Sequence, residues 1–238
     1  MNIILCGYGR MGAMLEGLVL ESDDMEIIGV VHPGLFDSAT DVPGHADAII
    51  DFSYPGNLEG ILERAARDDC AVVIGTTGYS EAQLEQIREA SKTLRIMYSS
   101  NYSVGVAVLK RAVALVASAL KDSFDIEIVE THHNQKADAP SGTAKMLLNA
   151  VDPDGSFRRV YGREGMPGAR GHEIGIHALR GGSVAGEHSV FFFGPDESLE
   201  FRHSAASRKI FAMGALRAAR YVAGRPAGLY CMDDVLGE

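Results

Sequence analysis

The residues best suited to chemistry lie together near the middle of the chain, where residues 130–144 read E-T-H-H-N-Q-K-A-D-A-P-S-G-T-A. His132 and His133 are adjacent, and Lys136 follows within the same stretch. Histidine titrates near neutral pH and is a natural proton donor, whereas lysine supplies a cation and a second possible acid. This combination of residues predicts proton transfer.

The end of the same stretch, Pro140-Ser141-Gly142-Thr143, has the pattern of a helix start. Ser141 is a favourable N-cap residue, and Gly142 removes the side chain at a position that a ligand could approach. Free backbone N–H groups in the first helical turn, together with the Thr143 hydroxyl, would bind a carboxylate or a phosphate. A proton donor, a cation and an anion-binding turn suit a small acidic substrate that accepts a hydride and a proton.

A strand is expected to deliver the two histidines. Residues 124–131 alternate in polarity, with Ile126 and Ile128 on one side, which is the period of a β-strand. If this strand continues through His133, the side chains of His132 and His133 point to opposite faces. The two histidines then have different functions.

Other interpretations of the same residues stay open. The histidines could be satisfied core residues, and Lys136 could be a solvated loop lysine. The pair could also bind a metal ion with a further histidine, although the chain has neither H-E-x-x-H nor a suitable carboxylate spacing. The further histidines available for such a site are His172, His177, His188 and His203. We predict no metal site.

A glycine-rich turn near the N-terminus predicts a nucleotide site. Residues 2–6 are an apolar run typical of a buried parallel strand, and a helical pattern follows the turn. The turn itself is Gly7-Tyr8-Gly9-Arg10-Met11-Gly12, which is G-x-G-x-x-G between a strand and a helix. In this pattern the first glycine permits the tight turn, the second admits a pyrophosphate, and the third lets helix pack on strand. The alternative is an ordinary glycine-rich turn.

The end of the second expected strand, residues 25–31, leaves the choice of nucleotide open. Dinucleotide sites usually have Asp or Glu here to hold the ribose hydroxyls. This chain has His32-Pro33-Gly34 instead, and apart from Arg10 no arginine or lysine lies near to grip a 2′-phosphate. His32 is either a ribose or adenine contact or a loop residue, and the cofactor is NADH, NADPH or both.

Further strands of the same sheet are expected at residues 46–52, 70–74 and 94–98. The segment between residues 31 and 46 is short, so a full helix there is doubtful. The later strands end in small or polar residues, which are Gly75-Thr76-Thr77 and Ser100-Asn101-Tyr102. Ligands of open parallel sheets bind at the carboxyl ends of strands, so these residues together favour a dinucleotide crevice. Each alone is equally well explained as a turn.

The second half of the chain has a different pattern. Residues 104–120 predict a long, buried helix, and residues 173–180, 186–193 and 198–204 predict strands joined as antiparallel hairpins. We therefore expect an α/β protein with two domains. A Rossmann-like parallel sheet occupies residues 1–103, and an α+β substrate-binding and oligomerisation domain with a mixed, largely antiparallel sheet occupies residues 104–207. A C-terminal helical segment, 208–238, is expected to return to the first domain.

Composition narrows the classes of partner. The formal net charge is −10, which argues against nucleic acid as a main partner, because phosphate binding needs a basic face. No apolar run approaches the ~20 residues that span a bilayer, so no membrane association is expected. The cysteines Cys6, Cys70 and Cys231 are odd in number and far apart, which is typical of reduced thiols in the cytoplasm.

The central motif resembles the signature of the dihydrodipicolinate reductase family, also called 4-hydroxy-tetrahydrodipicolinate reductases, of the diaminopimelate route to lysine. The resemblance extends over nearly the whole chain. Its other motifs are G-Y-G-R-M-G, D-F-S, G-T-T-G, S-N-Y-S-V-G-V, G-E-H-S-V-F-F and A-S-R-K-I-F-A-M-G-A-L-R-A-A. The central motif is highly specific, whereas the glycine loop alone is not.

The resemblance implies particular residue roles and a homotetramer. It makes His132 the proton donor and acceptor and Lys136 a second proton donor. His133, together with Gly142 and Thr143, would bind the carboxylates of a small dicarboxylate substrate. The residues implied to hold NADH or NADPH are the glycine loop (Gly7 to Gly12), Gly75, Thr76, Thr77, Ser100, Asn101 and Tyr102. Hydride would pass to C4 of an unsaturated, imine-bearing ring.

This chain departs from the family pattern after the second strand, where an acid, sometimes followed by arginine, is often found. His32-Pro33 stands there instead, and the following segment is shorter than in many members. Two other classes of function are weighed against the reductase. A nucleotide-sensing regulator need not keep proton donors, and an aspartate or homoserine dehydrogenase would not be expected to have H-H-x-x-K followed by S-G-T.

Overall fold

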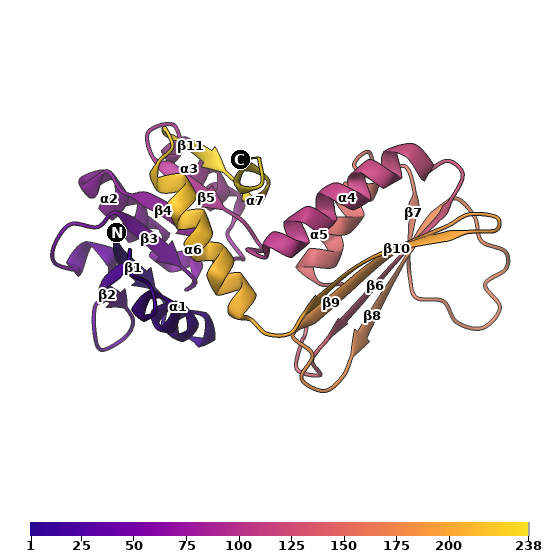
Figure 1. The fold of residues 1–238 in the computed structure, drawn as a ribbon, viewed down its shortest axis with the longest axis horizontal. Coiled ribbons are helices and arrows are strands. Elements are labelled where there is room, and N and C mark those ends of the chain that lie inside the picture. The colour runs from indigo at the N-terminus through magenta and orange to yellow at the C-terminus, as the bar shows by residue number, and fades with distance from the viewer. Residues whose placement is uncertain (238) are drawn as a thin grey trace. The chain divides into compact units, whose positions relative to one another are not determined.

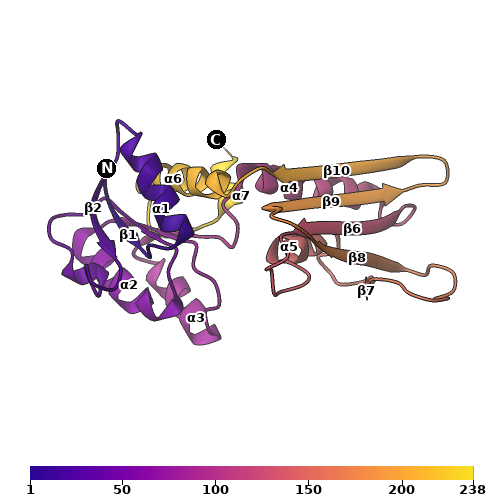
Figure 2. The same ribbon diagram turned by 90° about the horizontal axis from the view of Figure 1, so that it is seen from below.

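Two sheets organise the protein, each inside its own compact unit (Figures 1 and 2). The computed structural model describes residues 1–237. Unit 1 consists of Met1–Val104 together with the segment from Lys209 onward, and unit 2 is Gly105–Arg208. The expected α/β fold with two sheets is confirmed.

The sheet of unit 1 is parallel throughout and has the strand order β11-β5-β4-β3-β1-β2. Its central strands are buried on both faces and are apolar apart from Asp51 at the end of β3, as expected where helices cover both sides of a parallel sheet. The strands are β1 (Asn2–Cys6), β2 (Glu26–Val31), β3 (Ala48–Asp51), β4 (Ala71–Ile74), β5 (Arg95–Tyr98) and β11 (Gly228–Tyr230).

Helices cover both faces of this sheet (Figure 2). On one face α6 packs against β3, β4, β5 and α1. On the other, apolar side chains of α2 and α3 pack against the strands in one continuous core. The helices of unit 1 are α1 (Arg10–Leu20), η2 (Pro55–Asn57), α2 (Leu58–Asp68), α3 (Glu81–Ala90), α6 (Lys209–Ala223) and α7 (Met232–Val235).

The connection between β2 and β3 has no full helix, as its length predicted. It contains one 3-10 turn, η1 (Ala39–Asp41), and a buried arginine of the next α-helix donates hydrogen bonds to its backbone carbonyls. The guanidinium of Arg64, on α2, donates to the backbone carbonyls of Ala39 at 2.9 Å and Gly44 at 2.7 Å, and also to that of Val42. Its Nε is held by Asp68 at 2.7 Å. One side chain thus satisfies carbonyls that a helix would otherwise have paired.

Unit 2 contains a mixed sheet with the strand order β10-β9-β6-β8-β7 (Figure 2). The pairs β10–β9 and β9–β6 are antiparallel, and the pairs β6–β8 and β8–β7 are parallel. The strands are β6 (Asp125–His132), β7 (Arg158–Tyr161), β8 (Glu173–Arg180), β9 (Gly186–Phe193) and β10 (Ser198–Ala205).

The mixed sheet corrects one expectation. A run of hairpins was predicted, but only β9 and β10 form one, because β6 lies between β8 and β9. The short connection 181–185 passes the end of β6 and is hydrogen-bonded to it. Gly181 N–H donates to the His132 carbonyl at 2.9 Å, and His133 N–H donates to the Val184 carbonyl at 2.8 Å. The connection therefore fixes the chain at the two histidines.

Two helices, α4 (Val104–Leu120) and α5 (Gly142–Val151), supply the core on one face of the mixed sheet. Leu109 and Val113 of α4 and Leu147 of α5 pack there with isoleucines of β6 and β8. The long helix predicted over residues 104–120 is present, and within this unit its buried side includes Leu109 and Val113, whereas Leu115 is exposed. No helix within residues 1–237 combines the length and apolar character needed to cross a membrane.

The loop between β7 and β8 is fastened to the sheet by charged side chains. Glu127 on β6 accepts two hydrogen bonds from Arg163, at 2.8 and 3.0 Å, one from Arg170 at 3.3 Å, and contacts His177 at 2.7 Å. Burial acts to raise the pKa of Glu127, but the hydrogen bonds from Arg163 and His177 outweigh it and lower the pKa to about 2. This cluster ties the loop to the sheet through one carboxylate.

Candidate active site

The buried face of β6 changes from apolar to polar along the strand. Ile126 and Ile128 lie in the core, and Glu130 and His132, next on the same face, are also buried. This follows from the two-residue period of a strand. The strand therefore inserts a carboxylate and an imidazole into the end of the core of unit 2.

Glu130 is surrounded by donors. Its Oε1 accepts from Ser141 N–H at 3.1 Å and from Arg180 Nη2 at 2.8 Å, and its Oε2 accepts from Arg180 Nη1 at 3.0 Å and contacts Nδ1 of His132. Burial acts to raise the pKa of Glu130, but the hydrogen bonds from His132 and Arg180 prevail and lower it to about 2. Glu130 is therefore a carboxylate at neutral pH.

A second histidine lies against His132. The rings of His132 and His188 meet edge to face, with centroids 5.1 Å apart, and His188 Nε2 is 3.1 Å from the Ser141 hydroxyl. Burial, followed by the nearby His132, lowers the pKa of His188 to about 4. Ser141 Oγ also accepts from Ala144 N–H at 3.1 Å, which confirms the predicted N-cap of α5.

His133 has different partners from His132. Its Nε2 is 3.2 Å from Nη2 of Arg208. A guanidinium has no acceptor, so Nε2 of His133 accepts this hydrogen bond. The two adjacent histidines thus differ in their contacts, although β6 ends at His132 and does not continue through His133, and Arg208 adds a cation beside His133.

Lys136 forms an ion pair within its own loop. Its Nζ is 2.7 Å from Asp138 Oδ1, and the hydrogen bond from Lys136 holds the pKa of Asp138 below its usual value. The Asp138 carbonyl accepts from Arg180 at 2.8 Å. At the start of α5, a Cβ built on Gly142 would meet no atom within 4 Å, so that side of the turn is open.

One group in residues 1–237 has the spacing of metal ligands, namely Glu130, His132 and His188, whose ligand atoms lie within 4.8 Å of one another. The carboxylate in this group is already paired with the guanidinium of Arg180. A metal ion would have to displace that guanidinium or lie beside it. The charges of this group therefore favour the internal hydrogen bonds over a metal ion.

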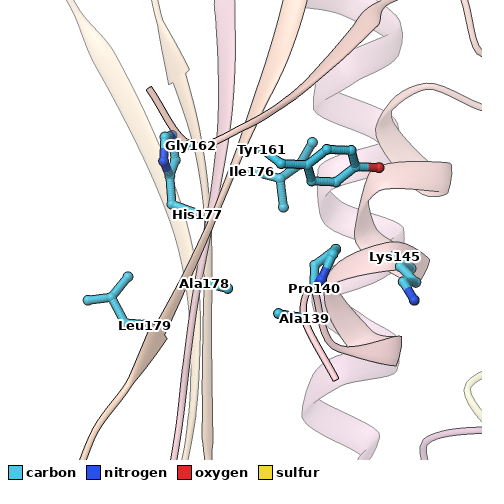
Figure 3. A pocket seen from close by; sticks show the side chains of 9 residues that line it. All are labelled: Ala139, Pro140, Lys145, Tyr161, Gly162, Ile176, His177, Ala178 and Leu179. Atoms are coloured by element: carbon cyan, nitrogen blue, oxygen red, sulfur yellow. The ribbon is translucent and has the colours of Figure 1, made fainter. Parts of the chain in front are cut away.

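A cavity of about 650 Å³ lies in unit 2 (Figure 3). Figure 3 shows Tyr161 and Ile176 pointing from the sheet toward Pro140, whereas His177 and Leu179 point the other way. Its lining residues are Ala139, Pro140, Lys145, Tyr161, Gly162, Ile176, His177, Ala178 and Leu179. None of the predicted catalytic or substrate-binding residues lines it, but Ala139 and Pro140 directly precede Ser141 in the chain.

In unit 1, the glycine loop joins β1 to α1, and the structure explains two of its glycines sterically. Gly7 has a φ of 93°, and a Cβ there would lie 2.5 Å from the Phe52 carbonyl oxygen. A Cβ on Gly12 would lie 2.2 Å from the Gly7 carbonyl oxygen. Gly9 is the N-cap of α1 and provides no side-chain cap. The tight turn and the close helix packing expected of this pattern are present.

Two aromatic rings meet where β1 and β2 end. The rings of Tyr8 and His32 are 5.9 Å apart in an edge-to-face arrangement. His32 Nδ1 is 3.0 Å from the Pro33 carbonyl oxygen, and both His32 and Arg10 are exposed. A nucleotide contact for His32 stays a prediction, and its position at the carboxyl end of β2 suits one.

The other predicted nucleotide residues follow β4 and β5. Thr76 is buried, and its hydroxyl accepts from Ser53 N–H at 2.8 Å. Tyr102 is also buried, and its hydroxyl donates to the Ile74 carbonyl at 2.7 Å. Their side chains therefore stabilise the fold of unit 1. The remaining residues, Gly75, Thr77, Ser100 and Asn101, lie at the same carboxyl edge, because the sheet is parallel.

Comparison with known proteins gives a full-length match. The family described as "Dihydrodipicolinate reductase, N-terminus" matches residues 1–102, and "Dihydrodipicolinate reductase, C-terminus" matches residues 105–236. The chain belongs to the dihydrodipicolinate reductase family. Members of this family are NAD(P)H-dependent oxidoreductases of lysine and diaminopimelate biosynthesis. This protein is therefore an NAD(P)H-dependent oxidoreductase of the same biosynthetic route.

Individual relatives agree with this family. The 4-hydroxy-tetrahydrodipicolinate reductase of Clostridium novyi is 41% identical over 247 residues, covering 99% of this chain and 98% of that one. The enzyme of the same name from Brachyspira hyodysenteriae is 42% identical over 238 residues, covering 99% of this chain and 100% of that one.

Solved structures show the same fold. A dipicolinate-bound dihydrodipicolinate reductase from Paenisporosarcina sp. TG-14 matches with a TM-score of 0.78 and 22% identity, covering 97% of each chain. A diaminopimelate dehydrogenase from C. glutamicum matches with a TM-score of 0.55 and 12% identity, covering 98% of this chain and 93% of that one. The reductase family thus shares its fold with other dehydrogenases.

Proposed function

We propose that this reductase family member converts 4-hydroxy-tetrahydrodipicolinate, or dihydrodipicolinate, to tetrahydrodipicolinate. NADH or NADPH supplies the hydride to C4 of the ring, and one proton completes the reduction. Starting from the 4-hydroxy compound, one water is released. The observation that carries the proposal is the buried Glu130–His132 pair inside a chain related over its full length to enzymes of that name.

His132 is the proposed proton donor and acceptor, and Lys136 is a second proton donor. Both are within a stretch whose other groups suit a dicarboxylate, namely His133, Ser141, Gly142 and Thr143. The cation of Arg208 beside His133 strengthens the attraction for an anionic substrate. Catalysis then consists largely of positioning and electrostatic stabilisation.

Unit 1 is proposed to bind the nucleotide, and unit 2 to bind the substrate and to form the contacts of a homotetramer. The proposed nucleotide residues are the glycine loop, His32 and the residues that follow β4 and β5. Because β2 is followed by His32-Pro33, no acid stands directly after this strand to repel the 2′-phosphate of NADPH. We propose a cytoplasmic location, where both nucleotides are available.

The test is oxidation of NADH and NADPH, side by side, with the substrate generated from pyruvate and aspartate semialdehyde by its synthase. Synthase-dependent oxidation is the expected result, and pyridine-2,6-dicarboxylate is expected to raise the melting temperature in the presence of NADH. Folded protein that binds NADH and oxidises neither nucleotide would contradict the proposal and favour a nucleotide sensor.

A further inference from the structure

A buried ion pair connects the segments that carry the proposed chemistry. Glu130 on β6 and Arg180 on β8 form two parallel contacts, at 2.8 and 3.0 Å. In the register of the sheet, Arg180 is the partner of His132. We propose that Glu130 and Arg180 are positioning residues for proton transfer at His132, an inference that rests on the proposed function.

The ion pair selects which nitrogen of His132 can react. A carboxylate only accepts hydrogen bonds, so Nδ1 of His132 carries a proton in its contact with Glu130. Nε2 is then the atom that gives a proton to the substrate or takes one from it. A Cβ on Gly186 would lie 3.1 Å from this Nε2, so the absence of a side chain at Gly186 leaves room around it.

The two partners act oppositely on the charge of His132. The carboxylate of Glu130 favours the protonated ring, whereas the guanidinium of Arg180 offsets that carboxylate. The ring of His132 contacts Glu130 on its own strand and His188 on β9. Arg180 on β8 is paired with that carboxylate, and the ion pair of Lys136 with Asp138 lies in the following loop. Removing Glu130 and removing Arg180 should therefore shift the titration of His132 in opposite directions.

The same pair also fixes the other proposed groups. Arg180 Nη2 donates to the Asp138 carbonyl at 2.8 Å, and the Asp138 carboxylate holds Lys136. Glu130 Oε1 accepts from Ser141 N–H at 3.1 Å, at the start of α5. One ion pair thus sets the positions of the His132 ring, the Lys136 loop and the helix start.

The decisive experiment follows the imidazole signals of the full chain by NMR across pH, with His132 assigned from the His132→Asn variant. In Glu130→Gln the midpoint for His132 is expected to move to lower pH, and in Arg180→Met to higher pH. Well-dispersed spectra establish that each variant is folded. If the unsubstituted protein is an active reductase but the His132 midpoint moves in the same direction in both variants, or in neither, the inference about Glu130 and Arg180 is wrong and the proposed function stands.

Activity provides the second readout. In both variants kcat should fall by about 10- to 100-fold, as it does when a group that orients a metal-bound histidine is removed, while NADH affinity stays unchanged. The part of the kcat–pH profile that depends on protonated His132 should shift in the same direction as the His132 midpoint measured by NMR. Arg180→Lys, which keeps the charge, should restore the pH profile. The His132 midpoints of Glu130→Gln and Arg180→Met could also move in opposite directions in a protein that has no reductase activity. That result would overturn the proposed function, but it would still show that Glu130 and Arg180 control the titration of His132.

A glycine substitution tests the reacting nitrogen. Gly186→Ala should lower kcat by crowding Nε2 of His132. Gly155→Ala also places a side chain on a backbone of positive φ, 66° against 158° at Gly186, but its Cβ would meet no atom within 4 Å, so it should leave kcat unchanged. Equal activity of the two variants would show that Nε2 is not the atom that transfers the proton.

Discussion

Arg64 offers a sharp test of how unit 1 holds its shortest crossover. The side chain is fully buried and donates to the carbonyls of Ala39, Val42 and Gly44. Arg64→Met keeps most of the volume and removes every donor. It leaves the three carbonyls without a donor and leaves Asp68 only its ion pair with the exposed Arg67. The free energy of unfolding should therefore fall by about 3–5 kcal/mol, the usual cost of removing one partner of a buried ion pair.

The neighbouring Arg67 is the matched control. It lies on the same helix and also contacts Asp68, at 3.1 Å, but its side chain is 51% exposed. Arg67→Met should cost no more than about 1 kcal/mol, as for exposed ion pairs. Urea unfolding followed by circular dichroism gives both values. Hydrogen exchange in residues 39–44 should rise much more in Arg64→Met than in Arg67→Met, which loses one exposed hydrogen bond of 3.3 Å to the Thr40 carbonyl. Equal costs for the two variants would refute the role given to Arg64.

Three further predictions concern unit 2. His132→Gln and Lys136→Ala should each lower kcat strongly and leave NADH affinity nearly unchanged, as measured by nucleotide titration; loss of NADH binding would contradict the assignment of functions to the units. Since the pKa of Glu127 is lowered to about 2, its contribution to stability is present above its ordinary value near 4.5 and is lost as pH falls toward 2. Glu127→Gln should therefore flatten the acid limb of a melting-temperature profile. The pKa of His188 is lowered to about 4 in the folded protein, so between pH 6.5 and 4 the unfolded chain binds more protons than the folded one. The free energy of unfolding should therefore decrease as the pH is lowered from 6.5 to 4. His188→Gln should reduce this slope.

Predictions from the sequence succeeded where structure depends on neighbouring residues. The alternation of residues 124–131 predicted β6, and Ser141 is the N-cap that its residue type predicted. The shortness of the β2–β3 connection correctly excluded a full helix. Each of these features depends on backbone geometry over a few residues, which the residue types largely determine.

Predictions failed where structure depends on distant segments. The connection 181–185 has the length of a hairpin, but β6 enters between the strands that it joins, and no local pattern records that insertion. Arg180 and Arg208 were missed for the same reason, since their partners lie 50 and 75 positions away. Glu130 had a signal, because it lies two residues before His132 and therefore on the same face of the strand.

The division of unit 1 into two segments has a consequence for its synthesis. Residues 105–208 are continuous and can fold as soon as they leave the ribosome. The sheet of unit 1 must wait for β11, which pairs with β5, and for α6, which covers β3, β4 and β5. Until then β5 has an open edge that could pair with other chains. Unit 1 is thus the last part of the protein to be completed, although most of its residues are the first to be made.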